Sequence, residues 1–491
     1  MIRWLFLTHR YLGIAIGLIM AMWCLSGIVM MYVQYPELGE RDRLANLDPL
    51  DFTSCCHLPP GALDTAPSFT GFRIQMLAGT PVLQLQSANP RRIGPQFDLA
   101  RGERLDAPGP DRIRRASEAW QERAGVQGSL SYEGALYNDQ WTVYAAYNPH
   151  RPLHRFAAGD EAGTEWYVSD TTGEVVQVTT AHQRFWNWLG AVAHWLYPTI
   201  LRQHTAVWAQ VVTWLTFIGI FLTVIGLYVG LKQYKARSNG RRSPYRGASL
   251  WHHYSGLVFG ILVLSWVVSG LFSMNPWGML EGESAAPEQA RLHDQGIDPA
   301  RLERFIDRLG PTAAGAQWVR LEGRSIGGEF AVLTLNRQGA KTRLDERLVT
   351  RPLTPKQWQA LAARLRPDTA VADAGLLHDE DNYYYEHHDR RDFPVYRIVF
   401  DDPGQTRYYL DAVSGELVLK IDAERRWYRW LHYGLHRGDF SAFLRGRPVW
   451  DMFMLMLMGG VSISCLTGAW MGVRRLRRNR RLRASRRLHG T

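Results

Sequence analysis

Two pairs of histidines stand at matching places in the two halves of the sequence. The chain has 16 histidines, and residues of the first half recur 242 or 243 positions later. Under these offsets only two histidine pairs coincide, His9 with His252 and His194 with His436. Two imidazoles that face each other inside a helix bundle are the donor set of a bis-histidine haem. Because no Cys-x-x-Cys-His motif occurs, such haems would be b-type and not covalently attached.

Residues beside these histidines could complete the sites. Arg184 and Arg426 are another matched pair, lie near the second histidine pair in the sequence, and are predicted to bind haem propionates. The sequence leaves open whether His253 or His432 replaces a neighbour as ligand. Four glycines either let the flat ring approach the helices or serve small-xxx-small helix packing; they are Gly13, Gly17, Gly256 and Gly260.

Four long apolar runs must position the histidines. About 20 residues of helix cross the hydrocarbon core of a bilayer, and each run is long enough to do so. The first run is too long for the apolar part of a signal peptide and is interpreted as a retained anchor. The predicted transmembrane helices are residues 11–33, 207–231, 254–274 and 450–473.

The distribution of charge predicts the orientation of these helices. The net charge of +11 and mean hydropathy of −0.23 hide two basic strips beside the apolar runs, Lys232–Arg246 and Arg474–Arg487. Such strips indicate membrane topology rather than a nucleic-acid surface. The N-terminus, the loop 232–253 and the tail 474–491 are therefore expected in the cytoplasm of a bacterium. The large segments 34–205 and 275–448 would then lie in the periplasm.

The two halves of the chain are related by an internal duplication. The stretch Trp166–Val175 recurs as Tyr408–Leu417, and many tryptophans, glycines and arginines recur at the same offset. Each half contains two spans, so both halves have the same orientation and form parallel repeats. We expect an integral membrane α-helical protein with four transmembrane helices as two parallel repeats, each carrying an α+β periplasmic domain.

Local patterns predict the elements of these two domains. Alternating and β-branched residues predict strands, and the stretches Asp-Thr-Thr-Gly-Glu and Asp-Ala-Val-Ser-Gly-Glu predict hairpin turns. Two further runs predict short helices. The predicted strands are 73–77, 81–85, 141–147 and 396–400, and the predicted helices are 302–309 and 355–365.

The chain resembles the PepSY-associated transmembrane helix family over nearly its whole length. The motifs that carry the resemblance include His9-Arg-Tyr-Leu-Gly with Trp23-Cys-Leu-Ser-Gly, and His253-Tyr-Ser-Gly-Leu with Trp266-Val-Val-Ser-Gly. The resemblance implies PepSY-like domains at 34–205, with an interfacial helix, and at 275–448. Its best understood members are iron-regulated inner-membrane proteins, including siderophore reductases with two bound haems.

By this resemblance the protein is expected to be a haem-dependent reductase of ferric siderophores or similar chelates. The four paired histidines would be the axial ligands of two b-type haems. The electron donor would be a quinol or a cytoplasmic reductase, and the other partner is the lipid bilayer, with no nucleic acid.

Two other functions stay open. One is a permease for metal chelates, although the spans lack the buried charges that transport sites usually need. The other is a non-enzymatic PepSY protein that binds a periplasmic partner or regulates a protease, which leaves the matched histidines without a purpose.

Three weaker signals remain. The stretch His378–Asp389 is rich in metal-ligand residue types and is either a metal or substrate contact or a solvated loop. Cys55 and Cys56 are adjacent, which rarely allows a bridge, and leave a copper or redox site open. Cys24 and Cys465 lie within spans and are interpreted as packing residues.

Overall fold

The chain forms two compact units, each described here by itself. The computed structural model describes residues 2–53, 55–64, 69–87, 89, 92–238, 240–293, 296–312, 317–387 and 390–488. The bundle unit consists of Met1–Tyr35, Phe185–Gly282 and Glu424–Thr491. The sheet unit consists of Pro36–Arg184 and Glu283–Ala423.

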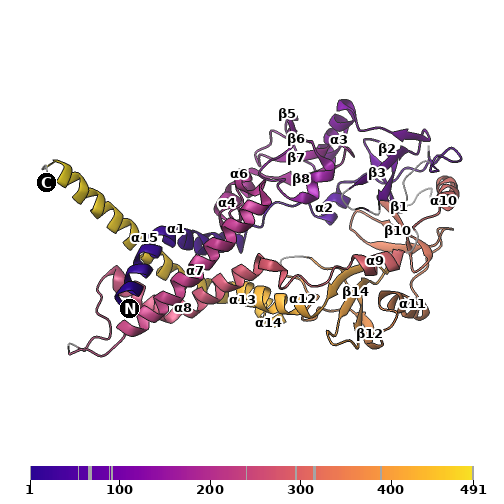
Figure 1. The fold of residues 1–491 in the computed structure, drawn as a ribbon. Helices are drawn as coiled ribbons and strands as arrows, with labels where there is room; N and C mark the ends of the chain where they lie inside the picture. The colour runs from indigo at the N-terminus through magenta and orange to yellow at the C-terminus, as the bar shows by residue number, and fades with distance from the viewer. Residues whose placement is uncertain are drawn as a thin grey trace. The chain divides into compact units, whose positions relative to one another are not determined.

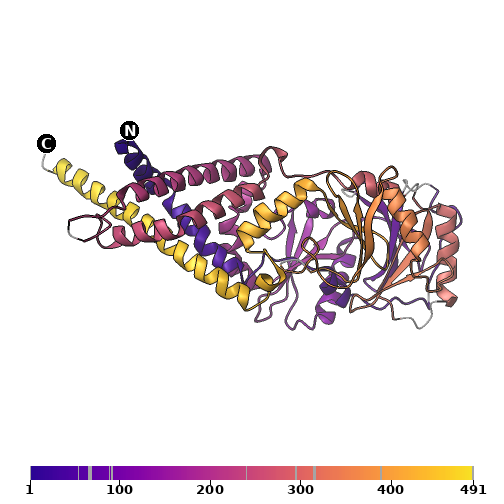
Figure 2. The ribbon, with the colours of Figure 1, turned by 90° about the horizontal axis from the view of Figure 1, so that it is seen from below.

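Four long helices form the bundle unit, as Figures 1 and 2 show. They are α1 (Ile2–Met30), α7 (Thr205–Gln233), α8 (Ala248–Ser273) and α15 (Val449–Leu488). All four are long and apolar enough to cross a membrane, which agrees with the prediction of four membrane helices and makes this a multi-pass membrane protein. Helices α1 and α8 each pack against α7 and α15. One buried side chain from each helix joins the same apolar core: Ile16, Leu222, Val263 and Val461.

The helices extend beyond the predicted spans. Helix α1 begins at Ile2 and α8 begins at Ala248, so His9 and His252 lie inside helices rather than in the segments that flank them. Helix α15 continues into the basic tail and projects beyond the other helices in Figure 1. Residues 489–491 of the predicted tail lie outside the described residues.

Short helical segments connect the long helices of the bundle unit. One of them, η3 (Arg429–Gly434), is a π-helix, a form that occurs mostly as single turns and often at functional sites. The others are α4 (Ala181–Leu189, which begins in the sheet unit), α5 (Ala191–His194), α6 (Thr199–Arg202), η2 (Pro276–Gly278), α12 (Ala423–Tyr428), α13 (Leu435–Arg437) and α14 (Ala442–Arg445).

Three antiparallel sheets form the sheet unit. The largest has the order β11 (Lys341–Leu344), β10 (Glu329–Leu335), β9 (Arg320–Ile326), β1 (Phe69–Leu77), β2 (Thr80–Ser87), β3 (Ile93–Asp98) and β4 (Glu103–Leu105). The second is β5 (Ser131–Leu136), β6 (Leu153–Ala157), β7 (Glu165–Ser169) and β8 (Val175–Thr179). The third is β12 (Val371–Leu377), β13 (Val395–Phe400), β14 (Arg407–Asp411) and β15 (Leu417–Ile421).

Helices cover the sheets and bury their apolar faces. Helix α10 (Pro299–Thr312) places Phe305 against Phe72 and Phe330 of the seven-stranded sheet. Helix α11 (Pro355–Leu365) stacks Trp358 on Tyr396, with ring centroids 4.1 Å apart. The remaining helices of this unit are α2 (Glu40–Ala45), α3 (Pro110–Arg123), η1 (Ala145–His150) and α9 (Ala286–His293).

The seven-stranded sheet joins the two large extramembrane segments of the sequence. Strand β1 pairs with β9, so residues from 69–77 and 320–326 lie side by side. Arg73 lies opposite Glu322 and donates to it at 3.2 Å, and Arg320 lies opposite Gln75 and donates to it at 3.1 Å. This pairing between the two segments is not predicted by any local pattern of the sequence.

One predicted strand is wrong. Residues 141–144 form a loop and Ala145–His150 forms the 3₁₀-helix η1, where a strand was expected over 141–147. Asp139 starts a turn by accepting hydrogen bonds from Trp141 and Thr142, and Pro149 offers no amide proton to a sheet. The other predicted strands and both predicted helices are confirmed.

The adjacent cysteines also differ from expectation. Cys55 and Cys56 are joined by a disulfide. The pair packs against the core of the seven-stranded sheet, and a Cβ at Gly310 would lie 2.6 Å from the Cys55 carbonyl oxygen. This close packing on the core holds the bridge, which leaves no free thiol for a copper site.

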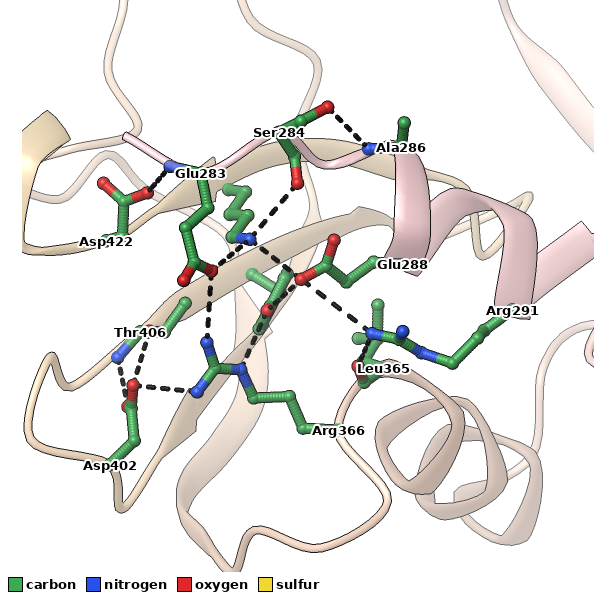
Figure 3. Close-up of polar contacts among 12 residues, drawn as sticks. Glu283, Ser284, Ala286, Glu288, Arg291, Leu365, Arg366, Asp402, Thr406 and Asp422 are labelled. Atoms are coloured by element: carbon green, nitrogen blue, oxygen red, sulfur yellow. Dashed lines mark hydrogen bonds and ion pairs between the residues drawn. The ribbon is translucent and has the colours of Figure 1, made fainter. Parts of the chain in front are cut away.

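A buried lysine and a buried glutamate of the sheet unit pair with each other. The amine of Lys420 from β15 donates to Glu283, which precedes α9, and to Glu288 in the first turn of α9. Figure 3 shows the two carboxylates among their polar contacts. Lys420 donates to Glu288 at 2.8 Å, Tyr408 donates to the same carboxylate at 2.9 Å, and Arg366 bonds Asp402 at 2.9 Å. Lys420 and Glu288 are buried, so this network ties α9 to the third sheet.

Candidate functional site

The first histidine pair lies between α1 and α8. The rings of His9 and His252 have centroids 6.2 Å apart, with an angle of 37° between their planes. His9 Nδ1 lies 3.2 Å from the Leu222 carbonyl oxygen, and His252 Nδ1 lies 3.0 Å from that of Ser464. A carbonyl only accepts, so Nδ1 carries the proton in both rings and Nε2 keeps its lone pair.

The second histidine pair is held in the same way. His194 of α5 and His436 of α13 have ring centroids 6.1 Å apart, with 67° between their planes. His194 Nδ1 donates to the carbonyl oxygen of Trp23 at 3.1 Å, and His436 Nδ1 to that of Trp266 at 3.2 Å. Burial lowers the pKa of His194 to about 4, which keeps the imidazole in its neutral, metal-binding form.

A glycine lies beside each of the four imidazoles, and two of these glycines make room for a ring. A Cβ at Gly226 would lie 2.6 Å from His9 Cε1, and one at Gly468 would lie 3.0 Å from His252 Cε1. At Gly27 and Gly270 a Cβ would be at ordinary contact distance from His194 and His436, 3.6 and 3.5 Å. Any side chain at Gly226 would push against a ring.

The four glycines singled out from the sequence do not contact these rings. A Cβ at Gly17 would meet the Ala469 backbone, and one at Gly260 would meet Leu227 at 2.5 Å, so these two pack helices together. Gly13 faces open space, and Gly256 faces Ser464. The glycines that do matter were visible in the sequence only as matched positions of the two halves.

The spacing of each pair fits a haem iron. An imidazole nitrogen binds a transition metal at about 2.1 Å and lies about 1.1 Å from its ring centroid, so two axial histidines have centroids roughly 6.4 Å apart. The observed 6.2 and 6.1 Å are close to this value. Among the described residues, Nδ1 is the only ring nitrogen of these four histidines that makes a hydrogen bond. The donor set and its ring spacing therefore fit the group.

The two pairs lie toward opposite ends of the bundle. On α1, His9 belongs to the first pair, whereas Gly27 faces the second; on α8, His252 and Gly270 have the same relation. Eighteen residues of helix separate the two positions in each case, about 27 Å along the helix axis. The bundle can thus hold one group near each of its ends.

The two histidines left open by the sequence have different surroundings. Both ring nitrogens of His253 are used, Nδ1 with Ser243 Oγ at 2.8 Å and Nε2 with the Gly230 carbonyl at 2.9 Å. No lone pair of His253 is left for a metal, so it is a structural residue. His432 lies in η3 and stacks on His436, with ring centroids 5.2 Å apart.

The predicted propionate arginines lie in different units. Arg184 belongs to the sheet unit, where it bonds Glu165 at 3.2 Å, Thr179 at 2.8 Å and the Gly163 carbonyl at 2.8 Å. Its guanidinium is thus held within its own sheet. Arg426 belongs to the bundle unit, on α12, and is half-buried.

The His378–Asp389 stretch does not form a metal site in the part of the chain that the structure describes. No group of three or more His, Cys, Asp and Glu side chains there could hold an ion. Asp381 is instead used by the fold, because it accepts from the Tyr409 hydroxyl at 2.8 Å and from backbone amides. His388 and Asp389 lie outside the described residues.

Comparison with known proteins identifies the family. The sequence profile of the PepSY-associated TM region family matches residues 6–321, which is more than half of the chain. A comparison with curated proteins gives no match. The matched stretch contains three of the four long helices, and with them His9, His194 and His252. The chain belongs to the PepSY-associated TM region family.

Proposed function

We propose that the protein is an inner-membrane carrier of two b-type haems that reduces ferric siderophores or similar ferric chelates in the periplasm. The observation that carries the proposal is the pair of histidine sites. Each presents two imidazoles at the spacing of axial ligands, with Nδ1 bound to a backbone carbonyl. When bound, haem iron supplies reversible one-electron chemistry.

The protein's own residues would bind and orient the group. Backbone carbonyls fix the tautomer and direction of each imidazole, which is the usual role of an outer shell of hydrogen bonds. A glycine lies beside each ring, and His9 and His252 are half-buried in the bundle. His9 and His252 would hold one haem, and His194 and His436 the other.

The proposal includes an internal duplication. Leu222 and Ser464, the two carbonyl partners of the first pair, are related by the offset of 242. Trp23 and Trp266, the partners of the second pair, are related by the offset of 243. The glycines that face the rings follow the same offsets. These repeated contacts support two parallel repeats. The basic strips of the sequence support the proposed orientation, with both termini in the cytoplasm.

The substrate would be Fe³⁺ held by hard oxygen donors. One electron converts it to Fe²⁺, whose smaller charge is bound far more weakly by such donors, so the iron leaves and the chelator is unchanged. The electron would come from a quinol or a cytoplasmic reductase.

Optical spectra and a pyridine haemochrome assay of the detergent-purified protein test the proposal. We expect two b-type haems per chain and re-oxidation of the dithionite-reduced protein by a ferric hydroxamate. A preparation without haem, from cells supplied with a haem precursor, would exclude this function.

A second experiment separates reduction from transport. Gallium(III) has the size and charge of Fe³⁺ but is not reduced under these conditions. We expect cells to release iron from a ferric chelate in a haem-dependent way and to leave the Ga³⁺ chelate intact. Uptake of the Ga³⁺ chelate through this protein would identify a permease instead.

A further inference from the structure

The two histidine pairs differ in the angle between their rings. The planes of His9 and His252 are 37° apart, whereas those of His194 and His436 are 67° apart. The carbonyl contacts of the two pairs are alike, so these contacts do not explain the difference. The pairs do differ in their backbone, since the first lies on the long helices α1 and α8 and the second on the short segments α5 and α13, and in side chains that surround only one of them.

His432 is such a side chain. Its ring stacks on the ring of His436 at 5.2 Å, with 27° between the planes. Its own Nδ1 donates to the Ser269 carbonyl at 3.1 Å, while the Ser269 hydroxyl lies 3.0 Å from His436 Nδ1. One serine therefore contacts both rings, and the buried His432 packs against one face of the His436 ring.

The fold gives the other three ligands no equivalent stack. Gly190 stands where the first half would place the counterpart of His432, and a Cβ there would lie 3.0 Å from Val29. No histidine fits at that position. Within the described residues, the only ring contact of His9 and His252 is with each other, and that of His194 is with His436.

The π-turn explains how His432 reaches this place. In η3 the backbone of Arg429–Gly434 is wound more widely than an α-helix, and α13 follows at once. Tyr428 and Tyr433 flank the His432 ring at 5.3 and 5.4 Å, which fixes its orientation. The segment thus places the His432 ring against the ring of His436, one of the proposed axial ligands.

We infer that His432 is a positioning residue that holds the second pair in a crossed arrangement, so that the two sites are electronically different. This inference rests on the proposed haem function. Axial imidazoles in nearly parallel planes donate into the same iron d orbital, whereas crossed planes donate into two and stabilise ferric iron less. A haem held by His194 and His436 would be the easier one to reduce.

Electron paramagnetic resonance of the oxidised, haem-loaded protein tests the inference without an activity assay. We expect two low-spin ferric signals, an ordinary rhombic one from the first pair and a highly anisotropic one from the second. An optical redox titration should give two steps, with the higher midpoint potential at the second pair. Two identical signals would overturn the inference and leave the proposed function standing, and absence of haem would end both.

Variants assign the difference to His432. His432→Leu removes the stacked ring and should convert the anisotropic signal to a rhombic one and lower the higher midpoint potential. His432→Phe keeps a ring and should retain the anisotropic signal. His253→Gln, beside the first pair, is the matched control and should leave that signal unchanged. Loss of one haem in both His432 variants would make His432 a ligand and would also overturn the inference.

Discussion

The buried polar side chains of the bundle unit and of the sheet unit differ in their hydrogen-bond partners. In the sheet unit Lys420 and Tyr408 both donate to the Glu288 carboxylate, and Arg73 and Glu322 pair across two strands. In the bundle unit each paired histidine has one nitrogen bonded to a carbonyl and the other left without a protein partner among the described residues. A network of paired side chains stabilises a fold, whereas an imidazole that keeps one free lone pair can bind a metal.

The largest effect on the protein should come from removing an imidazole whose Nε2 has no protein partner among the described residues. His194→Ala deletes one imidazole of the second pair, and we expect haem content to fall from two per chain to one. The spectrum of the first haem and the unfolding of the sheet unit should not change. A pyridine haemochrome count measures the haem content, and limited proteolysis measures the unfolding of the sheet unit. The control is His253→Ala, because both ring nitrogens of His253 are already in hydrogen bonds.

The next largest effect should come from breaking the buried Lys420–Glu288 pair. Lys420→Met leaves the buried Glu288 carboxylate without its cation, which should lower the free energy of unfolding of the sheet unit by about 3 kcal/mol. Denaturant unfolding followed by proteolysis measures this. The matched control is Glu283→Gln, because Glu283 is exposed and should cost less than about 1 kcal/mol. A change in haem spectra with Lys420→Met would contradict the separation of the two units.

A smaller effect is expected where the fold makes room for a ligand. Gly226→Ala places a Cβ 2.6 Å from His9 Cε1 and must displace the ring. We expect haem at the first pair to bind roughly 10- to 100-fold more weakly, as for other outer-shell changes at metal sites. Competition with apomyoglobin measures the transfer of haem. Gly13→Ala, which meets nothing within 4 Å, should have no effect.

The smallest effect concerns pH in the sheet unit. Burial opposes ionisation of Glu288, but hydrogen bonds from Lys420 and Tyr408 outweigh it and hold its pKa below 4.5. A depressed carboxylate pKa contributes stability above the unfolded value, and that contribution is lost as the pH falls through the folded value. The sheet unit should therefore lose stability below about pH 4.5. Glu288→Gln should flatten this part of the profile, and an unchanged profile would exclude the pairing as its cause.

The sequence predicts most clearly what local signals determine. The four membrane helices follow from long apolar runs, and the helix at 355–365 has the predicted limits because Thr354 caps it and Pro355 begins it. The strand expected at 141–147 failed because apolar alternation there reflects burial of a loop against the core, with Trp141 fully packed. Periodicity reports burial, and burial is not always a strand.

The candidate site could be predicted because its histidines recur at matching positions in the two halves of the sequence. The offsets alone selected His9, His252, His194 and His436, and the structure brings each pair together. The stacking of His432 on His436 was not predicted, because His432 lies in a π-helical turn and no pattern of this sequence predicts such a turn. The pairing of β1 with β9 was missed for a similar reason, because contact between strands far apart in the chain leaves no local signal.

That pairing also fixes the order in which the protein can be completed during synthesis. Ile74 and Leu321 lie opposite each other in the sheet, but α7 and α8 are translated between them. At about 5 to 20 residues per second, β1 waits roughly 12 to 50 s for its partner. During that time β1 is an open edge strand, the kind of surface to which other chains add. Two membrane helices must therefore be inserted before the seven-stranded sheet can close.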